Sequence, residues 1–237
     1  MRVLAIETAT PWGSVAVVGP AGVLAEESAH VPRRHLEWLV PAIDAALAGA
    51  GLAKDAIEGL AVSLGPGGFS GLRIGLATAS AWAVAAGVPL VGVSTLETIA
   101  AGAVGIDPAA PAGASLVLAA IDVRRGEIAA ALFRSGRPPT RLTPDLVLSP
   151  AALGDALPPI SAGERILVAG DALDRYSDAV LAALPPSAVA APPREWRPKA
   201  SVSGALGRVR LVLGEGDDPL SLVPRYSRHP NAREYAS

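Results

Sequence analysis

The sequence contains no cysteine, which excludes disulfides, thiolate metal sites and catalysis by a thiol. Histidine is also scarce. His30 and His35 are five residues apart with Pro32 between them, so they do not form the i, i+4 pair of a helical metal site. The longest apolar run, 76–92, carries polar residues and Pro89, so it is a poor membrane span. We therefore expect a protein with no bound metal and no membrane contact.

Charge is limited and nearly balanced. Charged residues make up 18% and hydrophobic residues 51% of the 237 residues, and the net charge is −2. This composition supplies the core of one large domain or two small ones. It also argues against a broad basic surface that binds nucleic acid unaided, although Arg33, Arg34, Arg124 and Arg125 leave room for a local basic strip. The first residues lead directly into an apolar strand, so we expect no secretion leader and a cytoplasmic protein.

Apolar periodicity predicts a regular order of strands and helices in the first half of the chain. Three short strands are followed by helix, strand, helix, strand and helix, which indicates a mixed sheet covered by helices. The segment 118–132 then repeats the pattern of 3–18, which makes Asp122 the equivalent of Glu7. The predicted fold is therefore α/β, with the two lobes of the actin-like and sugar-kinase ATPase (ASKHA) architecture, 1–105 and a smaller, less regular 106–237.

Two helices of the first lobe carry patterns that suit close packing. The first, 33–50, repeats large apolar residues on one face, which we expect to be buried: Leu36, Leu39, Val40, Ile43 and Leu47. A second face carries Trp38 and Ala42, where another helix is expected to approach. The second helix, 71–87, repeats small residues every four positions, which lets another backbone come close: Gly71, Gly75, Ala79 and Ala83.

The stretch "VSLGPGGFSGLRIG" (62–75) joins a strand to the second helix, and its glycines allow two interpretations. Backbone N–H groups of the loop and of the helix start could hold a phosphate or nucleotide. The candidate contacts are Gly65, Gly67, Gly68, Ser70 and Arg73. Alternatively, the glycines only make a tight strand-to-helix turn. The loop lacks the lysine of a Walker motif, which favours this structural interpretation.

Glu7 and Asp122 also allow two interpretations. As paired carboxylates in a cleft between the lobes, with Gly65, Gly67 and Gly68, they would suit an ATPase or phosphotransferase that acts on its own. Alternatively, each accepts hydrogen bonds at the end of its strand. We favour the second interpretation, because paired acids acquire a function only around a shared substrate. No nucleophile with its base is recognisable, which argues against a peptidase.

Several segments are similar, in order and spacing, to the bacterial TsaB (YeaZ) family: VLAIETAT, RRHLEWLVPAIDAAL, LAVSLGPGGFSGLRIGLATASAWA, VPLVGVSTLETIA, IDVRRGEIAAALF, VAGDAL and LVPRYSR. The glycine-rich segment is the most specific of them. The likeness is dense from residue 1 to about 135 and thin from 136 to 222. Residues 7–10, Glu-Thr-Ala-Thr, depart from the family's usual Asp-Thr-Ser-Thr, and Gly68 stands where serine is common. These departures weaken the case for an independent ATPase.

The resemblance implies two ribonuclease-H-like lobes and a non-catalytic accessory role. The family assists formation of N6-threonylcarbamoyladenosine at position 37 of tRNAs. Its partners are a TsaD-like catalytic subunit, which carries the metal and nucleotide, and a TsaE-like ATPase. tRNA is contacted only through the complex. The family forms a homodimer without that partner, and for this chain in isolation the sequence leaves both a monomer and a homodimer open. No cofactor is expected to bind the isolated chain firmly, and ATP or ADP only weakly or at the partner interface.

The resemblance assigns the partner interface to the helices 33–50 and 71–87. The candidate interface residues are Arg33, Arg34, His35, Trp38, Ala42, Arg73 and Leu76. Trp38 is the preferred anchor, because aromatic and arginine side chains are typical of interface centres. For Arg33 and Arg34, simple solvation is an equally good interpretation. The tail after residue 222 either docks on the partner or stays loose.

Overall fold

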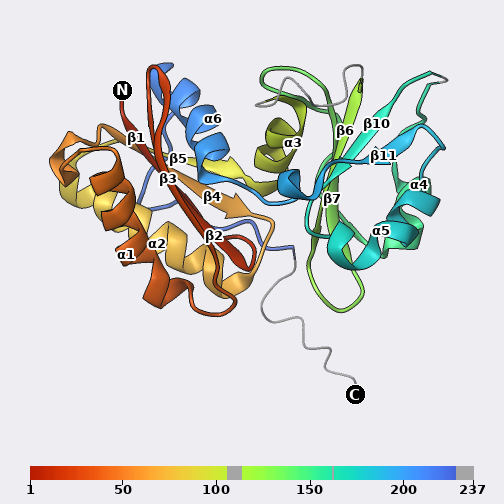
Figure 1. Cartoon of the computed structure of the whole chain (residues 1–237), viewed down its shortest axis with the longest axis horizontal. Coiled ribbons are helices and arrows are strands. Elements are labelled where there is room, and N and C mark those ends of the chain that lie inside the picture. Colours follow the sequence, from red (N-terminus) through yellow and green to blue (C-terminus); the bar gives the residue numbers. More distant parts are fainter. Residues whose placement is uncertain (106–113, 162, 228–237) are drawn as a thin grey trace.

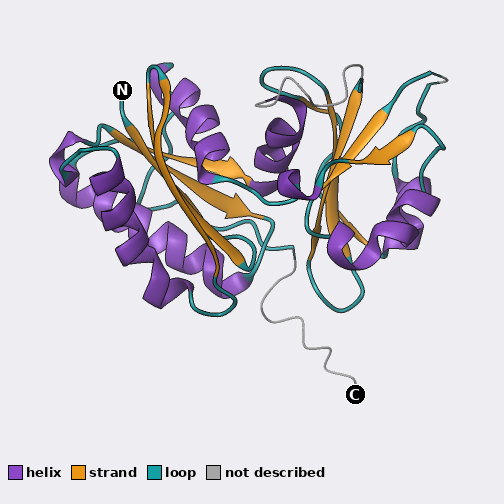
Figure 2. Cartoon of the chain, viewed as in Figure 1, coloured by secondary structure: helices purple, strands orange, loops and turns teal. Residues whose placement is uncertain are grey.

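The computed structural model describes residues 1–105, 114–161 and 163–227, which form two lobes, each built around one sheet (Figure 1). The first sheet has the strand order β3-β2-β1-β4-β5, and the second has the order β11-β10-β6-β7-β8 with β9 also paired to β7. Helices lie against both sheets (Figure 2). The predicted α/β fold class is confirmed.

The first sheet consists of β1 (Val3–Glu7), β2 (Trp12–Gly19), β3 (Gly22–His30), β4 (Gly59–Gly65) and β5 (Leu90–Ser94). The central strands β1 and β4 are buried along their whole length, which explains their unbroken apolar sequences. Two long helices, α1 (His35–Gly49) and α2 (Phe69–Ala86), cover one face of this sheet. Their inward side chains, such as Leu39, Ile43 and Leu76, complete that half of the core.

The second sheet repeats the pairing of the first. It consists of β6 (Leu116–Asp122), β7 (Ile128–Arg134), β8 (Thr140–Arg141), β9 (Leu146–Leu148), β10 (Ile166–Ala169) and β11 (Ala188–Ala190). β6 is antiparallel to β7 and parallel to β10, as β1 is to β2 and β4. The helices α4 (Leu153–Ala156) and α5 (Leu173–Ala182) pack on one face. The predicted internal repeat is therefore present in the strand pairing. Three short 3-10 turns, η1 (Lys54–Ala56), η2 (Pro150–Ala152) and η3 (Pro193–Glu195), lie in connections.

Two helices cross between the lobes, which the predicted boundary at 105/106 did not anticipate. The helix α3 (Thr95–Gly105) packs Leu96 and Ile99 against the second sheet. The helix α6 (Ala200–Val212) comes from the second half of the chain, yet Ala200 and Leu211 pack against the face of the first sheet opposite α1 and α2 (Figure 1). Each sheet thus gains a helix from beyond its own segment, because its second apolar face must also be covered.

The segment after α6 also docks on the first lobe. The Asp217 N–H donates to the Leu90 carbonyl (2.7 Å), and the Arg225 N–H donates to the Leu64 carbonyl (2.6 Å). Residues 217–226 therefore reach from the start of β5 to the end of β4 on their own chain. The predicted tail contacts beyond residue 227 lie outside the described residues.

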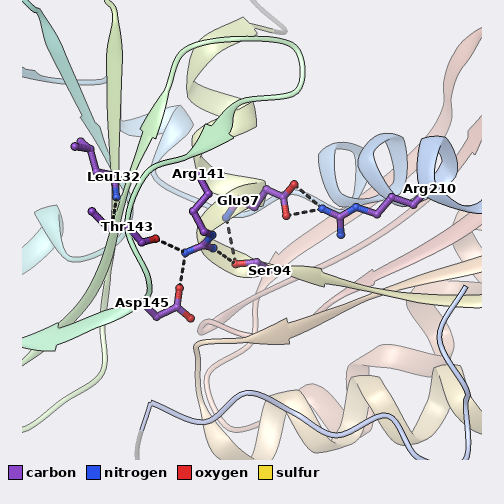
Figure 3. A network of polar contacts seen from close by, with 7 residues as sticks. All are labelled: Ser94, Glu97, Leu132, Arg141, Thr143, Asp145 and Arg210. Atoms are coloured by element: carbon purple, nitrogen blue, oxygen red, sulfur yellow. Dashed lines mark hydrogen bonds and ion pairs between the residues drawn. The ribbon is translucent and has the colours of Figure 1, made fainter. Parts of the chain in front are cut away.

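Polar side chains tie the lobes together beside α3 (Figure 3). Arg141, on β8 of the second sheet, donates from Nη2 to Ser94 Oγ (2.9 Å) at the end of β5 and from Nη1 to Asp145 (2.7 Å). On α6, Arg210 donates from Nη2 to both carboxylate oxygens of Glu97 on α3, at 2.6 and 2.7 Å. These charge-assisted contacts link both crossing helices and fix how the two sheets meet.

One face of α1 differs from the prediction. Leu39, Ile43 and Leu47 are buried as expected, but Leu36 is 74% exposed and Val40 is 54% exposed. The apolar stripe is too wide for the sheet to cover, so its outer edge faces away from the core. On α2, Val84 is likewise 54% exposed. Two neighbouring helices therefore present uncovered apolar side chains on the described part of the molecule.

Candidate functional site

A cleft of about 710 Å³ opens where the two lobes meet. Its walls come from the turn after β1, the start of α1, the start of α2, the turn after β6 and the loop after β10. The lining residues are 8–11, 32, 33, 35, 67–71, 121–125, 171, 226 and 227. The carboxyl ends of β1 and β6 both point to this cleft, as expected for equivalent strands of a repeated unit.

The glycine-rich loop brings α2 close to the turn after β1. The Gly68 N–H donates to the Ala9 carbonyl (2.7 Å), and a Cβ on Gly67 would lie 2.7 Å from the Ala9 Cβ. A Cβ on Gly71 would collide with the Thr8 carbonyl oxygen. The structural interpretation of these glycines is thus supported: side chains here would push α2 off the sheet. No side chain caps the first turn of α2, whose N–H groups begin at the cleft.

The predicted phosphate contacts divide into two groups. Gly67, Gly68 and Ser70 line the cleft, whereas Gly65 and Arg73 do not. Gly65 is covered by the Arg225 carbonyl of the C-terminal segment. Arg73 turns to that same segment, donating from Nε to the Tyr226 hydroxyl (2.7 Å) and lying 3.8 Å over the Phe69 ring. The prediction is corrected at these two positions, because a segment remote in sequence occupies the space.

The two strand-end acids bond to their own chain. Glu7 is fully buried, and its Oε1 accepts the Ala9 N–H (2.9 Å). Asp122 Oδ1 accepts the Arg124 N–H (2.7 Å). Asp122 lines the cleft and Glu7 does not, so the two do not form a pair across it. This supports the interpretation of each acid as a strand-end hydrogen-bond acceptor.

Burial disfavours the charged forms of two acids near the cleft. It raises the pKa of Glu7 to about 7, a rise only partly offset by the Ala9 N–H. It also raises the pKa of Asp171 to about 6. The Asp122 N–H, which donates to Asp171 Oδ1 (3.0 Å), offsets only part of this rise. Sequence reasoning did not single out Asp171, which lies in the VAGDAL segment; the repeat alone could have placed it beside Asp122.

The raised pKa of Glu7 predicts a loss of stability with rising pH. Because the folded state holds this proton more tightly than the unfolded chain does, the contribution is full below pH 4.5 and is lost as pH approaches 7. The loss is about 3 kcal/mol. Asp171 adds a smaller term of the same sign between its ordinary value, 3.8, and about 6. In Glu7→Gln, urea unfolding between pH 4.5 and 8 should show a flatter profile; an unchanged slope would contradict the assignment.

Three arginines stand at the cleft, and all have left-handed backbone conformations: Arg33 (φ 63°), Arg124 (φ 70°) and Arg125 (φ 58°). Arg33 comes from the first lobe, and the other two come from the turn between β6 and β7. Their clustering was visible in the sequence, but only the fold brings the two groups to one cleft. Arg34 points elsewhere and pairs with Glu37 at 3.0 Å.

The predicted interface residues are not all accessible. Arg33, Arg34 and Arg73 are exposed and Trp38 is half-buried. The prediction is corrected for three others, which are buried among the helices and the sheet: His35, Ala42 and Leu76. The large apolar residues of α1 and α2 that are more than half exposed are Leu36, Val40 and Val84 instead. Helical periodicity cannot distinguish a face turned to the core from one turned to a partner, which is why sequence reasoning missed them.

Comparison with known proteins places this geometry in a family. A family model described as "TsaD: tRNA N6-adenosine threonylcarbamoyltransferase" matches residues 18–179. An uncharacterized protein of Mycobacterium tuberculosis is 32% identical over 236 residues, 99% of this chain and 95% of its own. The Escherichia coli protein TsaB, named for tRNA threonylcarbamoyladenosine biosynthesis, is 42% identical over 131 residues, which cover 54% of this chain and 53% of that protein. The chain belongs to the TsaB (YeaZ) family.

Solved TsaB (YeaZ) structures agree with the fold. YeaZ from Pseudomonas aeruginosa has a TM-score of 0.80 at 26% identity, covering 95% of this chain and 99% of that one. A hexokinase from Thermus thermophilus has a TM-score of 0.52 at 14% identity, covering 90% of this chain and 100% of that one, which shows a shared fold alone. The match to Escherichia coli TsaB spans only about half the length of that relative. In the described parts of this family member, no helix is long and apolar enough to cross a bilayer.

Proposed function

We propose that this chain is a non-catalytic subunit of the machinery that makes N6-threonylcarbamoyladenosine at position 37 of tRNAs. Its role is to bind a TsaD-like catalytic subunit and hold it in a competent arrangement. The TsaB-named relatives support the pathway. A tRNA N6-adenosine threonylcarbamoyltransferase of Pelobacter propionicus is also 39% identical over 113 residues, which fits pairing between subunits of related fold.

The observation that carries the proposal is the uncovered apolar surface of α1 and α2. Leu36, Val40 and Val84 are each more than half exposed on helices whose other faces form the core. A partner helix that covered them would bury apolar surface, and each Å² of that surface would contribute about 25 cal/mol of favourable free energy. Arg33 and Arg34 at the start of α1 supply the charged rim that such interfaces carry.

The hydrogen bonds and positions of the strand-end acids support the accessory role. Glu7 and Asp122 each accept a backbone N–H two residues onward, and they do not share a cavity. A catalytic pair would need both carboxylates free to face one substrate. We therefore assign catalysis to the TsaD-like subunit. A TsaE-like ATPase and tRNA join through the complex, and the same helices pair two copies of this chain when the partner is absent.

Complex formation tests the proposal directly. The full chain is mixed at micromolar concentration with the TsaD-like protein of the same organism, and the mass of the eluting species is measured by light scattering. We expect a species containing both chains, and a homodimer of this chain alone. If both proteins are folded by circular dichroism and still elute separately, the proposed role is wrong.

A further inference from the structure

The helix α6 carries apolar side chains on the face that it turns away from the first sheet. Its inward side, which includes Leu211, packs against that sheet. On the outward side, Val209 is 53% exposed, Val212 is 58% exposed and Leu213, which directly follows the helix, is 68% exposed. Ala205, one turn before Val209, is exposed as well. These four residues recur at helical spacing and form one stripe, the α6 stripe: Ala205, Val209, Val212 and Leu213.

The charged residues of α6 leave this stripe uncovered. A helix at the surface ordinarily turns polar side chains to water. The two charged residues of α6, Arg208 and Arg210, both donate to their own chain instead. Arg208 Nε donates to the Met1 carbonyl (2.9 Å), and Arg210 is held by the carboxylate of Glu97. An uncovered apolar stripe without charged side chains is typical of an interaction surface.

Three carboxylates follow the stripe directly along the chain, on Glu215, Asp217 and Asp218. None of the three forms an ion pair in the part of the chain that the structure describes. They border a hollow of about 460 Å³ at the end of α6. Of the two arginines that also line this hollow, Arg210 is already engaged, so the guanidinium of Arg225 faces an excess of acids. Negative charge at the end of a helix opposes its dipole, so these acids do not stabilise α6.

The apolar stripe and its acidic border together select one kind of occupant. A segment that carries apolar residues with basic residues beside them would cover the stripe and compensate the carboxylates. A second copy of this chain does not fit, because its stripe has no basic residue and is bordered by the same acids. Four residues of one helix also bury far less than the roughly 800 Å² that each partner contributes to a stable dimer.

We propose that the α6 stripe is a docking site for a helical segment of a partner protein that carries apolar residues on one face and lysine or arginine beside them. Apolar anchors at helical spacing pack on Val209, Val212 and Leu213, and the basic side chains reach the carboxylates after the helix. This partner is a different chain from the TsaD-like subunit, because α6 covers the face of the first sheet opposite α1 and α2 (Figure 1). The docking site goes beyond the proposed function and does not depend on it.

The probe is a short fluorescein-labelled peptide of leucine and lysine, patterned as an amphipathic helix. A matched peptide has glutamate in place of every lysine. In anisotropy titrations with the full chain at physiological ionic strength, the lysine peptide should bind saturably, at least about tenfold more tightly than the glutamate peptide. Val209→Ser with Val212→Ser should weaken this binding by about tenfold or more, because both apolar contacts are removed without adding a charge.

Two further variants separate the apolar contribution from the charged one. Glu215→Gln with Asp218→Asn should weaken binding of the lysine peptide by about threefold, the effect of two exposed ion pairs. Leu36→Ser with Val40→Ser makes comparable changes on α1 and should leave the affinity for this peptide unchanged. Equal affinity for the two peptides, unchanged binding after the α6 substitutions, or an equal loss after the α1 substitutions would overturn the proposal.

A spectroscopic measurement locates the peptide without any substitution. The methyl resonances of Val209, Val212 and Leu213 should shift when the lysine peptide is added, while those of Leu36 and Val40 should not. Shifts confined to α1 would place the peptide elsewhere and refute the docking site.

Light scattering of the full chain without peptide tests a second copy as the occupant. A dimer that persists in Leu36→Ser with Val40→Ser but is lost in Val209→Ser with Val212→Ser would assign the stripe to a second copy and overturn the proposal. Binding of the TsaD-like subunit is measured separately on α1, so failure of the α6 site leaves the proposed function standing.

Discussion

Replacing Leu36 and Val40 with glutamate is expected to abolish binding to the TsaD-like subunit while leaving the fold intact. Both side chains are more than half exposed, so the substitutions cost little in the free chain. In a complex, each would bury an unpaired carboxylate at an apolar contact. Losing two anchors at about 2 kcal/mol each weakens binding by at least about 100-fold. Titration of the double variant against the partner, by calorimetry or light scattering, gives the dissociation constant.

The matched control lies on the opposite side of the same lobe. Val209 and Val212 on α6 are 53% and 58% exposed, so Val209→Glu with Val212→Glu makes the same change in size and charge. Since α6 covers the other face of the first sheet, this variant should bind the partner as the parent chain does. If the two double variants weaken binding equally, α1 is not the interface. If neither does, the exposed apolar stripe has another purpose.

The sequence was sufficient where the signal is local. The alternation of strands and helices was readable because it rests on residues near one another in the chain, and the repeat of the β1 pattern in β6 was readable because each copy is itself a local pattern. Leu36 shows the limit of prediction from a local pattern. It follows the same helical period as Leu39, and only the position of the sheet shows that one is buried and the other exposed.

Contacts between distant segments could not be predicted in this way. The crossing of α3 and α6 depends on which sheet face lacks a cover, which is a property of the assembled lobes. Arg73 illustrates the consequence for the site. Its place one turn into α2 made it a plausible phosphate contact. In the structure its Nε donates instead to the hydroxyl of Tyr226, 153 residues away. Arg33, Arg124 and Arg125 likewise come to one cleft only after β6 is folded beside the first lobe.

The glycines of α2 provide the second large expected effect, in stability. A Cβ at Gly71 would overlap the Thr8 carbonyl oxygen, and Thr8 Oγ1 already donates to the Gly71 carbonyl (2.9 Å). Neither backbone can yield without moving α2 off β1. Gly71→Ala should therefore destabilise the protein by about 2 kcal/mol or more, despite the gain of about 1 kcal/mol that alanine brings to a helix.

Gly102→Ala in α3 is the matched control, because it makes the same substitution in a helix without the close packing found at Gly71. Its added Cβ would meet only Val202 Cγ2 at 3.8 Å, an ordinary contact, so the helical gain should appear as a small stabilisation. Urea unfolding of both variants measures the two effects with opposite signs. If Gly71→Ala were as stable as Gly102→Ala, the glycines of α2 would not be needed for its approach to β1.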